Sequence, residues 1–177
     1  MIAIAILLGN LSFGMLFGFG LLFPSAPVWH MPPNDMPQMV TGLEALFQDG
    51  WGFPLAVTDR LVAPMRISIV FTDSLPWFTL LLKALDLSPD KVAPLALFLL
   101  VGHVMQAIGM MALLRALGVE RPAGLIGGVA LALLMPAWII RQFGHIGLSE
   151  HFILLLTLAL SATAARTGLT STSAQRF

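Results

Sequence analysis

The run VAPLALFLLVGHVMQAIGMMALL, residues 92–114, holds no Asp, Glu, Lys or Arg and decides the class of the protein. At a rise of about 1.5 Å per residue, an α-helix of this length would cross the roughly 30 Å hydrocarbon core of a bilayer. Three other runs are similarly apolar: residues 2–23, 122–140 and 147–165. The sequence therefore predicts an all-α membrane protein with about four transmembrane helices.

The composition agrees with this class and excludes others. Apolar residues make up 58% of the chain and charged residues 10%, and the mean hydropathy is +0.91, values outside the range of soluble proteins. The formal net charge is zero and no basic cluster is present, which excludes a nucleic acid partner. Cysteine is absent, which excludes disulfides and cysteine metal sites. The lipid bilayer is the expected partner.

The first apolar run has a second interpretation as a cleaved signal peptide. No Lys or Arg follows Met1, and the run is longer than the apolar part of a usual signal peptide. These features favour a spanning helix at residues 2–23.

Residues 24–91 form a long loop that we expect outside the hydrocarbon. Its first part, residues 24–66, holds seven of the twelve prolines and four acidic residues. Apolar residues within it recur at helical spacing and predict an amphipathic helix on the membrane surface. They are Met36, Met39, Val40, Leu43, Leu46 and Phe47.

The last part of this loop, ISIVFTDSLPWFTLLLKAL at residues 67–85, has two possible topologies. The polar triplet 72–74 and Pro76 leave two pieces too short to span, which favours a juxtamembrane or re-entrant helix beginning near Ser74. Four spans then put four arginines on the cytoplasmic side, as the positive-inside rule prefers. They are Arg115, Arg121, Arg166 and Arg176. The acidic loop and the link at 141–146 would face outward, and the polar tail 166–177 is expected to be disordered.

Asp35, in the segment PPNDMPQ, is the first candidate for chemistry. An ionised carboxylate beside the membrane would serve as a general base or bind a metal-linked phosphate. The alternative is structural, because Asp35 with Gln38 three residues later resembles a capping box at the start of the surface helix. The spacing leaves both interpretations open.

Asp73 and Ser74 have a similar double interpretation. Polar side chains at membrane depth are expensive unless they line a watered cavity or bind a ligand. Either residue would also cap the helix that Pro76 opens.

The segment RQFGHIGLSEH carries the densest ionisable cluster, which consists of Arg141, His145, Glu150 and His151. Arg141 would bind a phosphate through its planar guanidinium, and the histidines would bind or transfer protons. The alternative places Arg141 at the interface and Glu150 at a positive helix end. The His145–His151 spacing is not that of a metal pair, so no metal site is predicted. His103 and Gln106 are expected to form interhelical hydrogen bonds.

Three blocks of the sequence resemble a known superfamily in order and spacing. They are PPNDMPQMVTGLEALFQDGWGFPL (32–55), SIVFTDSLPWFTLLLKAL (68–85) and RQFGHIGLSEHFILLLTLAL (141–160). They are similar to the N-terminal blocks of bacterial integral membrane glycosyltransferases of the GT-C type. Within it the chain resembles an uncharacterised branch, distantly related to protein mannosyltransferases and lipid A aminoarabinose transferases.

The resemblance implies an enzyme of the bacterial inner membrane that transfers a sugar from a polyprenyl-phosphate donor to an acceptor on the outer face. Asp35 would be the catalytic base, or a ligand of a divalent cation where a subfamily uses one. Substrate binding would fall to Asp73, Ser74, Arg141, His145, Glu150 and His151. Such enzymes usually have more spans than four, so the chain resembles the N-terminal portion of a longer protein, whose other part would be a partner.

A different class of function is a non-enzymatic membrane module, such as a transporter fragment, an assembly subunit or a lipid-binding scaffold. Transport would place ionisable residues near the bilayer midplane, where His103 alone fits. An inactive truncated product is the third interpretation.

Overall fold

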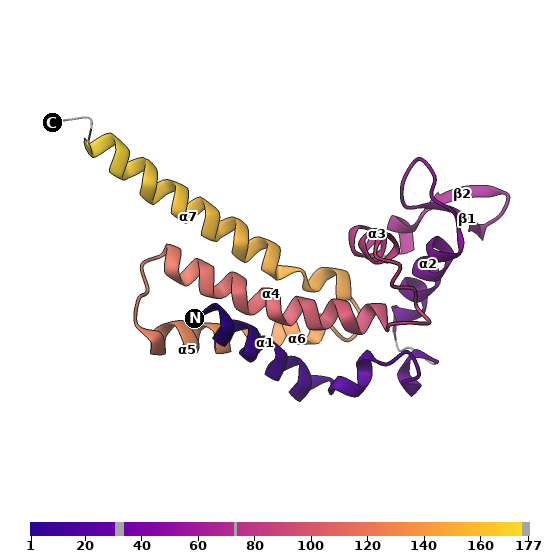
Figure 1. The fold of residues 1–177 in the computed structure, drawn as a ribbon, viewed down its shortest axis with the longest axis horizontal. Helices are drawn as coiled ribbons and strands as arrows, with labels where there is room; N and C mark the ends of the chain where they lie inside the picture. Colours follow the sequence, from indigo (N-terminus) through magenta and orange to yellow (C-terminus); the bar gives the residue numbers. More distant parts are fainter. Residues whose placement is uncertain (31–33, 73, 175–177) are drawn as a thin grey trace. The chain divides into compact units, whose positions relative to one another are not determined.

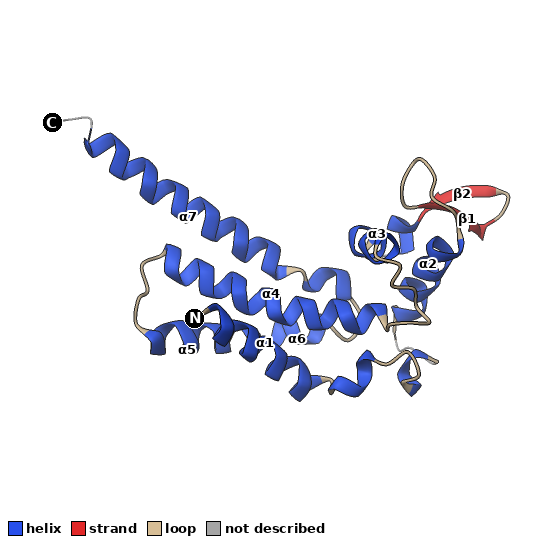
Figure 2. Ribbon diagram, viewed as in Figure 1, coloured by secondary structure: helices blue, strands red, loops and turns tan. Residues whose placement is uncertain are grey.

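The computed structural model of the chain describes residues 1–30, 34–72 and 74–174, with side chains described as far as residue 168. The described part is mostly helical and contains a single two-stranded sheet (Figures 1 and 2). Two compact units can be distinguished. The helical unit consists of Met1–Leu16, Leu100–Ile139 and the chain from Ser149 onward, and the loop unit consists of Phe17–Leu99 and Ile140–Leu148.

Long apolar helices are consistent with the membrane class in their length and composition. Three helical stretches are long and apolar enough to cross a bilayer: Pro94–Ala116, Pro122–Arg141 and Ile146–Gly168. The first is α4; the second joins α5 (Pro122–Leu133) and α6 (Pro136–Arg141); the third joins η4 (Ile146–Ser149) to α7 (His151–Ala174). They correspond to the predicted spans at 92–114, 122–140 and 147–165, so the protein is membrane-associated.

The first predicted span differs from the structure in its length. Helix α1 runs from Ile2 to Leu16, and a separate 3₁₀ turn, η1, covers Phe19–Leu22. Gly18, between them, has a φ of 73° and a ψ of 142°, a non-helical conformation that glycine adopts without strain. The 15 residues of α1 give a helix of about 22 Å, shorter than a bilayer core. A fourth crossing therefore stays a prediction.

The core of the helical unit is formed by α1, α4, α5 and α6. Its buried residues are Ala5, Ala107, Met111, Leu125, Val129, Leu133 and Trp138. The Trp138 indole donates a hydrogen bond to the Ser149 carbonyl at 2.8 Å, which fixes the residues just before α7. His103 is fully buried, and its ring packs 5.8 Å from that of Phe13 and 4.7 Å from that of Trp138. This buried histidine is thus surrounded by aromatic contacts.

In the loop unit, the predicted amphipathic helix is confirmed as α2, Met36–Gln48, but its apolar face has a different role. Met36, Met39, Leu43 and Leu46 are buried. The helix packs on strand β1 (Val57–Val62), on η3 (Ile69–Thr72) and on α3 (Pro76–Ala84). The expectation that this face lies on the membrane surface is wrong, because the loop provides its own apolar partners.

The all-α prediction is wrong for residues 57–68, which form an antiparallel hairpin. Strand β1 pairs with β2 (Met65–Ser68) through Val57 opposite Ser68, Thr58 opposite Ile67 and Val62 opposite Met65, with an irregular register between. Val57, Thr58 and Ile67 are β-branched, which favours strands. The strands are short, and the polar pair Asp59–Arg60 interrupts the alternation that would have revealed them.

Two further segments complete the comparison with the sequence. Helix α3 begins at Pro76 and has nine residues, which is too short to cross a bilayer, as predicted for 67–85. Helix α7 continues to Ala174, so residues 166–174 are helical where a disordered tail was expected. Arg166 donates a hydrogen bond to the Ala116 carbonyl at 2.8 Å, and the Thr167 hydroxyl bonds to the Thr163 carbonyl. These contacts support the helix beyond its apolar part.

Candidate functional site

Asp35 and His145 lie side by side in the loop unit, although 110 residues separate them in the sequence. The Asp35 carboxylate oxygen Oδ2 is 3.4 Å from Nδ1 of His145, and each side chain is 61% exposed. The pair is therefore an ion pair when the imidazole is protonated, and both groups stay accessible to a ligand. The sequence singled out both residues, and the structure brings them together.

Asp35 occupies the N-cap position of α2 but does not cap the helix with its side chain. Gln38, the other half of the expected capping box, donates instead to the Phe71 carbonyl at 3.0 Å. The capping interpretation is wrong for both side chains, since Asp35 turns to His145 and Gln38 holds the end of η3. Only the Asp35 carbonyl takes part in the helix start, accepting from the backbone N–H of Gln38.

The residues around the pair hold the 140–148 link against the start of α2. The Asn34 side chain donates to the Phe143 carbonyl at 2.6 Å. The Phe143 ring packs 5.3 Å from that of Phe17, and Gly144 lies under Asn34, where a Cβ would be 3.4 Å from the Asn34 Cβ. These contacts come from three separate segments and fix the backbone that carries Asp35 and His145.

Arg141 and Gln142 precede His145 in the same link. The Arg141 carbonyl accepts the backbone N–H of His145 at 2.9 Å, so the two residues share one turn, and the Arg141 side chain is exposed. Gln142 is fully buried, and neither its amide nitrogen nor its oxygen has a hydrogen-bond partner among the described residues. Sequence reasoning missed Gln142 because an uncharged residue between Arg and Phe carries no signal of burial.

Ser74 is structural in this fold. Its side chain is fully buried, and its hydroxyl bonds to the Met39 carbonyl at 2.8 Å and to the Thr72 hydroxyl at 2.5 Å. It ties α2 to the segment before α3, whose N-cap is Leu75. The hydroxyl is buried and already hydrogen-bonded, so this geometry gives no support to the predicted role of Ser74 in substrate binding. Asp73, its predicted companion, lies outside the described residues.

Glu150 and His151 belong to the helical unit. His151 is the first residue of α7, and the Glu150 carbonyl accepts the N–H of Ile153 at 3.1 Å. Glu150 therefore precedes a helix N-terminus, where a carboxylate is favoured electrostatically. Of the predicted cluster, Arg141 and His145 share the loop unit with Asp35.

Comparison with known proteins places almost the whole chain in one family. A family model described as Domain of unknown function (DUF6311) matches residues 6–175. The chain belongs to the DUF6311 family. No curated protein and no solved structure matches it.

The described residues of this DUF6311 chain were predicted to hold no metal site, and their arrangement bears on that prediction as follows. They contain no group of three or more His, Asp or Glu side chains that could hold a metal ion. Asp35 and His145 alone would supply two protein ligands, fewer than the three or four of a zinc site.

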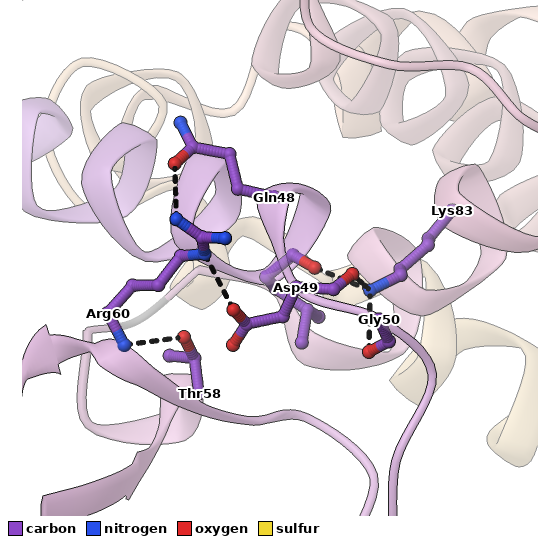
Figure 3. A network of polar contacts seen from close by, with 7 residues as sticks. Gln48, Asp49, Gly50, Thr58, Arg60 and Lys83 are labelled. Carbon is purple, nitrogen blue, oxygen red and sulfur yellow. Dashed lines mark hydrogen bonds and ion pairs between the residues drawn. The ribbon is translucent and has the colours of Figure 1, made fainter. Parts of the chain in front are cut away.

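A second polar network, distant from Asp35 along α2, stabilises the loop unit of the DUF6311 chain (Figure 3). The Lys83 ammonium donates to the carbonyls of Leu46 and Asp49 at 2.5 and 2.7 Å, at the C-terminal end of α2. The Arg60 Nε donates to the Asp49 carboxylate at 2.6 Å. A hydrogen bond from Thr58, and then the charges of Arg60 and Lys83, hold the pKa of Asp49 below its ordinary value. Burial lowers the pKa of Lys83.

None of the residues in this network was among the predicted site residues. Its members come from α2, β1 and α3, and each charge is used to close a helix end or to pair with a neighbour. Charges satisfied in this way serve the fold, and the Asp35–His145 pair remains the candidate site.

Proposed function

We propose that this DUF6311 chain carries the acceptor-activating part of a membrane glycosyltransferase of the GT-C type. One observation carries the proposal: the Asp35 carboxylate is free of any capping role, exposed, and 3.4 Å from Nδ1 of His145. The resemblance of the three sequence blocks to GT-C enzymes supports the same assignment. The donor would be a polyprenyl-phosphate-linked sugar, and the reaction would take place at the outer face of the bacterial inner membrane.

In the proposed reaction, Asp35 accepts the proton of an acceptor hydroxyl as the oxygen attacks the anomeric carbon of the donor sugar. The bond from that carbon to the phosphate oxygen breaks, and the phosphate leaves with the polyprenyl chain. The two carboxylate oxygens have different roles: Oδ2 faces His145, whose imidazolium form would pair with it and fix the orientation of the carboxylate. This leaves the other oxygen for the acceptor.

Arg141 would act on the leaving group. Its exposed guanidinium is on the same link as His145 and presents a planar set of donors suited to a phosphate. Charge that develops on the phosphate oxygens would be stabilised there more strongly than in the ground state, which is the condition for a rate effect.

The test is transfer from labelled polyprenyl-phosphate sugars by the protein in membranes, comparing Asp35→Asn with Asp59→Asn. Asp59 is an exposed acid of the same unit and serves as the matched control. Loss of a general base lowers the rate by about 10²–10⁴-fold, and we expect this for Asp35→Asn alone. Equal transfer by both variants, at equal expression, would remove Asp35 from the mechanism. Donor binding without transfer in the unmodified chain would favour a lipid-binding scaffold.

A further inference from the structure

The loop between α2 and β1, residues 51–55 with the sequence WGFPL, exposes three large apolar side chains. Trp51 is 59% exposed, Phe53 87% and Leu55 56%. Water at this many neighbouring apolar groups is unfavourable, and contiguous exposed apolar surface of this kind marks an interaction site.

Both ends of the loop are held by the core of the loop unit. Before it, the Lys83 ammonium binds the carbonyls of Asp49 and Gly50 and lies 5.2 Å from the centre of the Trp51 ring. After it, Ala56 is buried with Leu46 and Ile69, and its carbonyl accepts the Ile69 N–H at 2.9 Å. The fixed ends of the backbone keep these apolar side chains exposed. A loop with free ends could fold back and bury them.

One cationic side chain lies beside the loop. Arg66 is exposed, and its Nη2 lies 3.7 Å from the position that a Cβ on Gly52 would take. Residues 50–58 contain no Asp or Glu. Of the carboxylates on either side, Asp49 is paired with Arg60, and Asp59 is exposed. A guanidinium beside exposed Trp and Phe side chains matches an anionic headgroup above an apolar layer.

We propose that the WGFPL loop inserts into the interface of the bilayer, with Trp51, Phe53 and Leu55 at the boundary of the acyl chains and Arg66 on a lipid phosphate. The loop unit runs directly into α4, which is long enough to cross a bilayer, so the chain connects this unit to a lipid surface. This proposal is independent of the glycosyltransferase assignment.

The test uses the full chain, which has no native cysteine, in nanodiscs made of equal parts phosphatidylcholine and phosphatidylglycerol. A Phe53→Cys variant carries an environment-sensitive fluorophore, and Glu44→Cys, an exposed position on α2, carries the same probe as the control. We expect lipids brominated in the acyl chain to quench the probe at position 53 several-fold more than the probe at 44, and aqueous iodide to do the reverse. Equal bromolipid quenching at both positions overturns the proposal. So does a probe at 53 shielded from both quenchers, which would indicate a protein partner.

Arg66→Gln tests the headgroup contact. We expect Arg66→Gln to reduce bromolipid quenching at position 53 in the anionic nanodiscs and to have little effect in pure phosphatidylcholine. The charge-conserving variant Arg66→Lys should keep most of the quenching. Arg66 is exposed, so neither variant should disturb folding. An equal effect of Arg66→Gln in both lipid compositions would exclude a contact with anionic phosphate.

Discussion

The Asp35 carboxylate and the His145 imidazole are 3.4 Å apart and equally exposed, so their contact contributes little to stability. The Phe17, Asn34 and Phe143 contacts, not this pair, hold the two segments together. Substitutions of Asp35 can therefore be interpreted as changes in chemistry.

Asp35→Ala should change the free energy of unfolding by less than about 0.5 kcal/mol, because an exposed pair is weak. If the Asp35 side chain capped α2, the same substitution would lower the free energy of unfolding by about 1 kcal/mol. Chemical denaturation of the purified chain in detergent measures the difference. Ser74→Ala, which removes a buried hydroxyl bonded to Met39, is the positive control and should lose about 1–2 kcal/mol. A loss at Asp35 as large as that at Ser74 would restore the capping interpretation.

Lys83→Met should destabilise the loop unit by about 1–2 kcal/mol, since the carbonyls of Leu46 and Asp49 would lose their shared donor. Lys91→Met is the matched control, because Lys91 lies at the surface and binds Asp86. Lys91→Met should lower the free energy of unfolding by less than about 0.5 kcal/mol. Hydrogen exchange of the α2 amides would locate the effect, and equal losses for the two lysines would contradict the role given to Lys83.

The pH dependence of stability should include a contribution from Asp49. Its pKa is lowered in the folded protein by Thr58, Arg60 and Lys83, so the unfolded chain binds more protons than the folded one. The stabilisation is complete above the ordinary aspartate pKa and is lost as the pH falls below about 4. Between neutral pH and pH 3, the unfolding temperature of Asp49→Asn should fall less steeply than that of the unmodified protein. An unchanged decline would mean that other carboxylates account for it.

Gly9→Ala should destabilise the helical unit by about 1–3 kcal/mol, because its Cβ would lie 2.6 Å from the Val104 Cα, a backbone atom that cannot turn aside. Gly127→Ala, in α5, meets no atom within 4 Å and should be neutral or slightly stabilising. Thermal unfolding in detergent compares the two. Equal unfolding temperatures for the two variants would show that α1 and α4 are not in close contact at Gly9.

The proposed four-span topology places the loop unit outside and residues 115–121 inside the cell. In a chain without native cysteine, Asp59→Cys should react with a membrane-impermeant maleimide in intact cells, and Glu120→Cys only after permeabilisation. Both positions are exposed, so reactivity reports the side of the membrane. Labelling of both from outside would require 67–85 or α1 to be assigned differently.

Within the loop, sequence patterns predicted local structure better than they predicted contacts. The spacing of Met36, Met39, Leu43 and Leu46 correctly predicted α2, since a helix face follows from periodicity alone. The same spacing does not say what covers that face, and here α3 and the hairpin cover it. Ser74 and Asp35 looked alike as polar residues beside prolines, yet one is buried and the other exposed.

The sequence by itself determined the membrane class, because runs of apolar residues long enough to cross a bilayer need no tertiary information to be recognised. It also named Asp35 and His145 as ionisable residues outside those runs. Only the tertiary structure decided that the two side chains meet, because contacts between residues 110 positions apart depend on the path of the whole chain. The same holds for the anchored WGFPL loop, whose exposure results from the way Lys83 and Ala56 fix its ends.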